Sequence, residues 1–101
     1  MESREMYKQK YQAQLHELSA KVDAIKARAE LLTAQAKLDA RPHVERVHDT
    51  FEAAKKTVHE ITVATDERWD EVKHGADHAW SELKAAVEGA YDAIRSPPDQ
   101  H

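Results

Sequence analysis

Two histidines one helical turn apart are the residues best suited to chemistry. His74 and His78 are separated by four residues, so they share a helix face that Glu71 extends. Imidazole and carboxylate groups are ligands for zinc, copper or nickel, which makes the three residues a candidate metal site. Because Gly75 rather than a glutamate follows His74, this is not the metalloprotease motif. The competing interpretation is an exposed polar face, and firm metal binding would need ligands from a second chain.

A second histidine pattern follows an eleven-residue spacing. His48, His59 and Asp70 are each eleven residues apart, with Asp66 close by in the sequence. Eleven residues span three helical turns, so these side chains align along one side of a helix. Histidine titrates near neutral pH, so this row is a candidate pH-responsive strip. The alternative is that the row is only a by-product of the repeat.

Motifs for enzyme catalysis are not found in the sequence. The chain has no cysteine, no glycine-rich phosphate loop and no recognisable pairing of a nucleophile with a base. Its 101 residues are 34% charged and include only two glycines, a composition typical of long helices and coiled coils. We therefore expect a single all-α domain over residues 1–101, with no enzymatic activity and no cofactor unless the histidines bind a metal ion.

The last third of the chain repeats an aromatic-led segment. Trp69, Trp80 and Tyr91 lie eleven residues apart, and each begins a similar run of residues. The repeat predicts a helix with a continuous apolar stripe. We expect the stripe to be a seam or a partner interface, formed by Trp69, Val72, Ala76, Trp80, Leu83, Val87, Tyr91 and Ile94.

Residues 3–40 are predicted to form the first helix, with Ser3 as its N-cap. Apolar residues spaced alternately by four and three give an uninterrupted coiled-coil heptad pattern. The heptad positions are Tyr11, Leu15, Leu18, Val22, Ile25, Ala29, Leu32 and Ala36. Because Pro42 suits a first helical turn better than a helix interior, we place a sharp turn at residues 39–42.

Residues 43–95 are predicted to form the second helix, in which heptads give way to eleven-residue repeats. Two positions could break it: the β-branched segment near 62–66, where Thr65 would cap a new helix, and Gly75. The apolar stripe keeps its phase through both positions, which favours a continuous helix. The proline-containing tail, residues 96–101, is predicted to be disordered.

The two predicted helices have unequal lengths, roughly 57 Å and 80 Å at about 1.5 Å per residue. A long antiparallel hairpin would therefore leave the apolar end of the second helix uncovered. Dimerisation into a helical bundle would cover it, and we rank this arrangement first. The alternatives are a chain that folds back near 62–66 into a three-helix bundle, or binding to another protein or a membrane surface.

The charge distribution along the chain argues against nucleic-acid and membrane partners. The net charge is −4, and the excess of acidic residues lies in residues 51–101, which have six Lys and Arg against eleven Asp and Glu. Neither half has the basic stripe that nucleic-acid binding requires. Acidic residues also outnumber Lys73, Lys84 and Arg95 beside the stripe, so a membrane partner is not favoured. No secretory signal or membrane span is recognisable, which predicts a cytoplasmic protein.

The whole pattern resembles a largely uncharacterised family of small bacterial coiled-coil proteins associated with stress responses. The resemblance lies in residues 7–15, in the Lys- and Ala-rich heptads up to Ala36, and in the repeats that begin at Trp69 and Trp80. It implies a stress-related role and offers no catalytic residues. From the residues we expect an interaction or scaffold protein that self-associates or binds a protein partner through the stripe. Metal binding by the histidines and reversible binding to a membrane surface are the alternatives.

Overall fold

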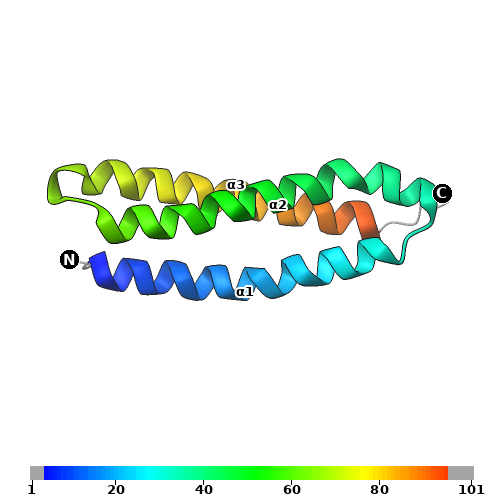
Figure 1. Ribbon diagram of the computed structural model, residues 1–101, viewed down its shortest axis with the longest axis horizontal. Helices are drawn as coiled ribbons and strands as arrows, with labels where there is room; N and C mark the ends of the chain where they lie inside the picture. Colours follow the sequence, from blue (N-terminus) through cyan, green and yellow to red (C-terminus); the bar gives the residue numbers. More distant parts are fainter. Residues whose placement is uncertain (1–3, 96–101) are drawn as a thin grey trace.

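The chain folds into three helices that pack against one another. The computed structural model describes residues 4–95, and its helices are α1 (Arg4–Glu30), α2 (Ala34–Val63) and α3 (Trp69–Arg95). Each helix runs antiparallel to the one before it, and the bundle measures 53 × 21 × 19 Å (Figure 1). The predicted all-α class is confirmed, but the two-helix hairpin is wrong, and the three-helix alternative describes the structure.

The first reversal lies at residues 31–33 rather than at 39–42. Helix α1 ends in a tightened turn, in which the amide of Leu31 donates to the carbonyl of Arg28 over 3.0 Å. Helix α2 begins after Thr33, whose Oγ1 accepts a hydrogen bond from the amide of Ala36 over 3.2 Å. This N-cap satisfies one of the free amides of the first turn. The predicted boundary is wrong because the start of α2 is set by the Thr33 cap and not by Pro42, which lies inside the helix.

Pro42 lies inside α2, two turns after its start. Proline has no amide hydrogen, so the carbonyl of Leu38 loses its helical donor at this point. Leu38 lies on an exposed part of α2, where water can hydrogen-bond this carbonyl. The free energy gained when α2 packs on its neighbours therefore outweighs the free-energy cost of a proline inside the helix.

The second reversal shows that the predicted continuous helix over 43–95 is wrong. Helix α2 ends at Val63, and a short 3₁₀ helix, η1 (Asp66–Arg68), leads into α3. The break falls in the β-branched region named as one alternative, whereas Gly75 lies within α3 and does not interrupt it. Thr65 occupies the N-cap position of η1 but makes no side-chain capping bond. The predicted Ser3 cap and the tail 96–101 lie outside the described residues.

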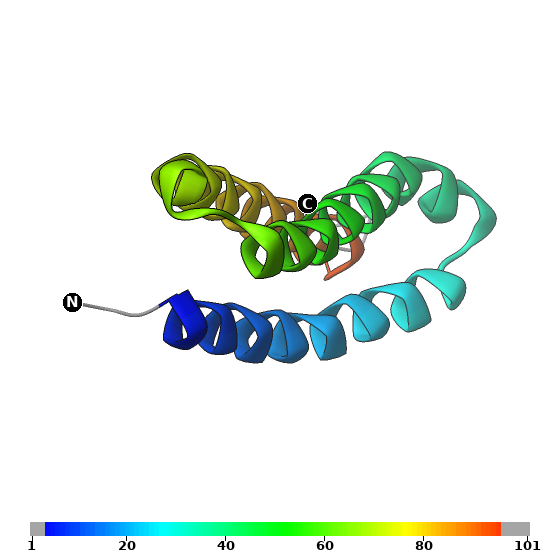
Figure 2. The same cartoon turned by 60° about the vertical axis from the view of Figure 1, so that its left-hand side comes forward.

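The core is a narrow seam between the three helices. The predicted heptad positions of α1 from Tyr11 to Ile25 are buried. Those from Leu15 to Ile25 share the main cluster with Ala40, Val47 and Ala54 of α2, whereas Tyr11 lies in a second cluster with Ile61 and Ala76. Helix α3 completes the main cluster with its own buried residues: Leu83, Ala86, Val87, Ala90 and Ile94. Helices α2 and α3 pack together most extensively, and α1 runs along one side of this pair (Figure 2). One side of α1 therefore faces away from the rest of the molecule.

Candidate interaction surfaces

The predicted partner interface on α3 is used inside the chain. Ala76, Leu83, Val87 and Ile94 are buried, and Trp69, Val72, Trp80 and Tyr91 are partly buried against the same clusters. Because α2 and α3 have nearly equal lengths, 30 and 27 residues, no apolar overhang remains to be covered. Within the chain, α1 and α2 cover much of the stripe, and its use as an interface with a partner stays a prediction.

The candidate metal residues lie on the outer side of α3. His74, His78 and Glu71 are all exposed, and Glu71 forms an ion pair with Arg68. Within residues 4–95, no group of three or more His, Asp or Glu side chains is placed to hold a metal ion. His48 and His59 of the predicted pH-responsive strip are exposed on α2. The zinc, copper or nickel alternative gains no support from this placement.

An aromatic clasp holds the first half of α1 against α3. We use this name for Tyr7, Tyr11, Trp69 and Trp80. The rings of Tyr7 and Trp69 meet edge to face, with centroids 5.4 Å apart, and those of Tyr11 and Trp80 lie 6.0 Å apart. Such pairs add stabilisation beyond the area that they bury. The clasp therefore holds the first half of α1 against α3.

The Tyr11 hydroxyl is the buried polar group of this clasp. It donates a hydrogen bond to the carbonyl of Ala76 over 3.3 Å. Burial raises the pKa of Tyr11 above its usual value, a hydrogen bond with Thr57 lowers it, and the charge of Asp77 raises it further. The pKa is raised mainly because the hydroxyl is removed from water, and its hydrogen bonds are made within the bundle instead.

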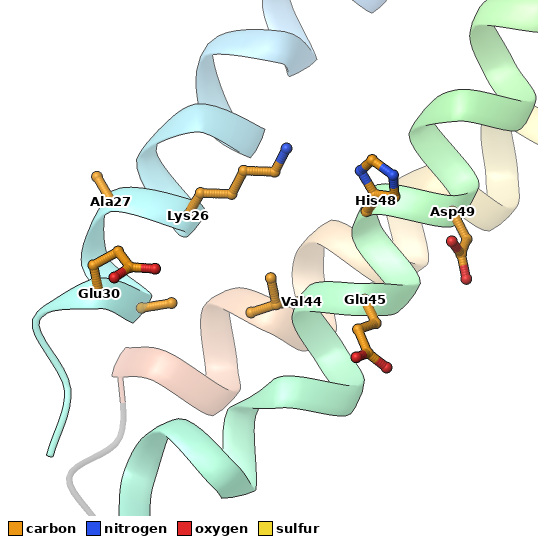
Figure 3. Close-up of a pocket in the computed structure, with 8 residues that line it drawn as sticks. Lys26, Ala27, Glu30, Val44, Glu45, His48 and Asp49 are labelled. Carbon is orange, nitrogen blue, oxygen red and sulfur yellow. The ribbon is translucent and has the colours of Figure 1, made fainter. Parts of the chain in front are cut away.

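An open groove separates the second half of α1 from α2. It has a volume of about 790 Å³ and is lined by Lys26, Ala27, Ala29, Glu30, Val44, Glu45, His48 and Asp49. Lys26 reaches from α1 in the direction of His48 on α2, and Val44 lies between the two helices (Figure 3). Alanine and valine side chains make its floor apolar, whereas its rim carries both charges. The groove is adjacent to the outward-facing side of α1, with which it shares Ala27.

Positive charge near this groove affects a neighbouring carboxylate. A hydrogen bond from Lys55 lowers the pKa of Glu52, desolvation opposes it, and the charges of Lys55, His48 and Lys26 lower the pKa further. Glu52 is exposed, and its ion pair is with Lys55 of the same helix, at 3.0 Å. Solvent screens such an exposed pair.

The side of α1 opposite the core is a second apolar face. The "outer face" of α1 consists of exposed apolar residues at heptad-like spacing, Met6, Ala13, Ala20, Ala24 and Ala27, and the exposed Leu31 follows it in the first reversal. Leu31 is 85% exposed and Met6 is 55% exposed, and both are among the most exposed large apolar residues described. At 100° per residue, these positions project away from the buried row Tyr11 to Ile25. Helix α1 thus has two apolar sides, of which the bundle uses one.

The outer face was missed at first, although its signal is present in the sequence. Met6, Ala13, Ala20 and Ala27 are each seven residues apart, in a phase different from that of the core heptad. The larger residues Leu15, Leu18 and Ile25 dominate the pattern, and alanine counts weakly in any measure of amphipathicity. The second heptad becomes recognisable because the structure shows that the residues of the first are buried on the other side of α1.

No helix of the described residues has the length and apolar content needed to cross a membrane. Comparison of the chain with protein-family models, with curated proteins and with solved structures gives no match.

Proposed function

We propose that this chain is a non-enzymatic scaffold protein that works by self-association through the outer face of α1. The observation that carries the proposal is the exposure of Met6 near the start of α1 and of Leu31 in the turn just after it, with small apolar residues of α1 exposed between them. Each exposed alanine leaves only a small apolar surface in water, so the free monomer is not strongly disfavoured. A second helix that covers the whole length of the face would bury all of these surfaces together, which is favourable.

Small residues favour this kind of contact for a geometric reason. Ala13, Ala20, Ala24 and Ala27 let a second helix backbone approach closely, so dispersion contacts form along the full length. Exposed alanine is also common on the helices of soluble proteins, where its only contribution is its high helix propensity. The repeated spacing by seven, and the leucine and methionine at the ends, favour the interaction over that simpler interpretation.

The resemblance to stress-associated coiled-coil proteins extends the proposal to a stress-related role in the cytoplasm. This extension rests on the resemblance, whereas the self-association rests on the α1 surface. Neither metal binding nor binding to a membrane surface is favoured by a specific observation on the described residues.

Solution mass tests the proposal. We expect light scattering to show a dimer whose fraction rises with concentration, and Ala20→Glu to shift the chain to monomer. Ala53→Glu is the matched control, because Ala53 is also exposed but lies on α2, away from the outer face. Both variants should retain helical circular dichroism. A wild-type chain that stays monomeric at high concentration, or equal effects of the two substitutions, would contradict the proposal.

A further inference from the structure

We infer that this chain has a second, domain-swapped state, in which α2 and α3 join into one long helix and α3 packs on a second copy of the chain. The structure shows the closed state, in which α3 folds back on its own α2 (Figure 1). In the swapped state, the apolar stripe of α3 lies on α1 and α2 of the second copy, through the contacts that it makes within its own chain when closed. This inference goes beyond the proposed function, because it does not use the outer face of α1.

The phase of the apolar residues across the second reversal is the first observation for this state. A straight helix would place four apolar residues and one threonine on one side, because they follow one another at spacings of three or four: Val58, Ile61, Thr65, Trp69 and Val72. A chain that reverses at residues 64–65 has no need of this register, because the turn separates the facing of α3 from that of α2. A continuous helix that keeps one side covered does need it.

The reversal itself is made by two residues with ordinary backbone angles. Ala64 has φ −65° and ψ 137°, and Thr65 has φ −84° and ψ 165°. Both φ values are near that of a helix, so rotation about ψ in these two residues would continue α2 into η1. Neither glycine nor proline occurs between Pro42 and Gly75, and Thr65 makes no side-chain cap that would fix the start of η1. No residue type at the hinge therefore excludes a continuous helix.

Exchange of α3 preserves the packing that holds the closed chain together. The contact of α3 with α2 is the most extensive in the bundle, and each copy would make the same contact with its partner. Because α2 and α3 are antiparallel, the two long helices would cross at their hinges, and each half of the dimer would reproduce one closed bundle. Such an exchange is a low-cost route to a dimer, and short connections such as residues 64–65 are the hinges that favour it.

Charges at the hinge favour the closed state at low concentration. The guanidinium of Arg4 donates a hydrogen bond to the carbonyl of Ala64 and lies 3.2 Å from Oδ1 of Asp66. In a continuous helix, this carbonyl would instead accept from the amide of Arg68. Asp66 and Glu67 also lie in the first turn of η1, where negative charge is favourable near the positive end of a helix dipole. We therefore expect the swapped dimer to be the minor state, formed when chains refold together at high concentration.

The distance between two spin labels on one chain tests the inference. The double variant Arg46→Cys, Glu82→Cys provides two labelling sites in this cysteine-free chain, at exposed positions of α2 and α3. In the closed state the two side chains meet at 3.5 Å, so the labels lie within about 20 Å of each other. In the swapped state they are 36 residues apart on one straight helix, which places them about 54 Å apart.

The labelled chain is refolded at high concentration with an excess of unlabelled chain, so that each dimer holds at most one labelled copy. Size-exclusion chromatography separates monomer from dimer, and pulsed electron–electron resonance measures the distance in each. We expect the short distance in the monomer and the long distance in the dimer.

The outcomes separate this inference from the proposed function. A dimer that keeps the short distance would overturn the swapped state and would leave association through α1 unaffected. The absence of any dimer after refolding at high concentration would also overturn it. Chains that are never unfolded report on the outer face of α1 alone, because their α3 has not left its own bundle. A swapped dimer should also survive Ala20→Glu, which does not alter any contact of α3.

Two substitutions of Asp66 test the hinge directly. Both remove the ion pair with Arg4, but only proline excludes a continuous helix, because it lacks an amide donor and clashes with the preceding turn. The closed state accommodates proline at this first position of η1, since Thr65 before it is extended. Asp66→Pro should lower the dimer fraction about tenfold or more, whereas Asp66→Ala should raise it severalfold. Both monomers should retain helical circular dichroism, and equal dimer fractions in the two variants would overturn the opening of the hinge.

Discussion

The hydroxyl of Tyr7 donates a hydrogen bond to Oδ1 of Asp77 over 2.6 Å, across 70 residues of sequence. This bond joins α1 to α3 beside the aromatic clasp, where Lys73 also lies 5.6 Å from the centre of the Tyr7 ring. Helix α1 is thus anchored to α3 by specific polar and aromatic contacts in its first half. In its second half it borders the open groove and carries the exposed Leu31.

Tyr7→Phe should lower the free energy of unfolding by about 0.5–1.5 kcal/mol, the usual net value of one hydrogen bond. The phenylalanine ring retains the contact with Trp69, so the loss isolates the hydroxyl. Urea unfolding monitored by circular dichroism measures the difference. Tyr91→Phe serves as the control, because no hydrogen bond of the Tyr91 hydroxyl is found within residues 4–95. Equal losses in the two variants would show that the Tyr7–Asp77 bond contributes nothing specific.

Thr33→Ala should destabilise the protein by about 1 kcal/mol, since it removes the side-chain cap of α2. Thr65→Ala should cost much less, because Thr65 occupies the equivalent position before η1 without a side-chain capping bond. Thermal unfolding of both variants tests the comparison. If Thr65→Ala were the more costly change, the assignment of the α2 start to Thr33 would lose its energetic support.

Pro42→Ala should stabilise the bundle by on the order of 1–3 kcal/mol, because it restores an amide donor within α2 and removes a steric clash with the preceding turn. Hydrogen exchange should then detect a protected amide at position 42. An unchanged or lowered midpoint of unfolding would contradict this expectation and would mean that Pro42 costs α2 no stability in the folded bundle.

Gly75→Ala should stabilise α3 by about 0.5–1 kcal/mol, the difference in helix propensity between the two residues. A methyl group at this position would meet no atom within 4 Å, and the backbone is helical. Gly89→Ala is the companion variant, because a methyl group there would lie 3.9 Å from Nδ1 of His43, an ordinary contact distance. Denaturant midpoints should rise in both variants, and a fall at Gly75 would indicate a constraint on α3 beyond its own helix.

The raised pKa of Tyr11 predicts a loss of stability at alkaline pH. Its stabilising contribution is fully present below the unfolded pKa of about 10 and is lost as pH rises through the higher folded pKa. Tyr11→Phe should therefore flatten the dependence of unfolding free energy on pH above 10. Ultraviolet titration of the phenolate gives an independent measurement, and an unshifted titration of all three tyrosines would contradict the burial argument.

The apolar patterns determined which side of each helix would be covered. Tyr11, Leu15, Leu18, Val22 and Ile25 are buried as their spacing predicts, because exposing one whole side of a helix to water is unfavourable whatever lies opposite. The same argument predicts that Leu83 and Val87 lie in a seam between packed helices. The outer face of α1 was equally readable from its spacing by seven, although its use in association remains a proposal.

Only the tertiary structure decided where the chain reverses and which helix covers the α3 stripe. Pro42 predicts a sharp turn at residues 39–42, but packing through Ala40 and Val47 on both sides of it keeps α2 continuous. An amphipathic pattern requires a cover for its apolar side without specifying whether that cover comes from the same chain or from another. Reversals at residues 31–33 and 64–65 give three helices of similar length, so the chain itself supplies the cover.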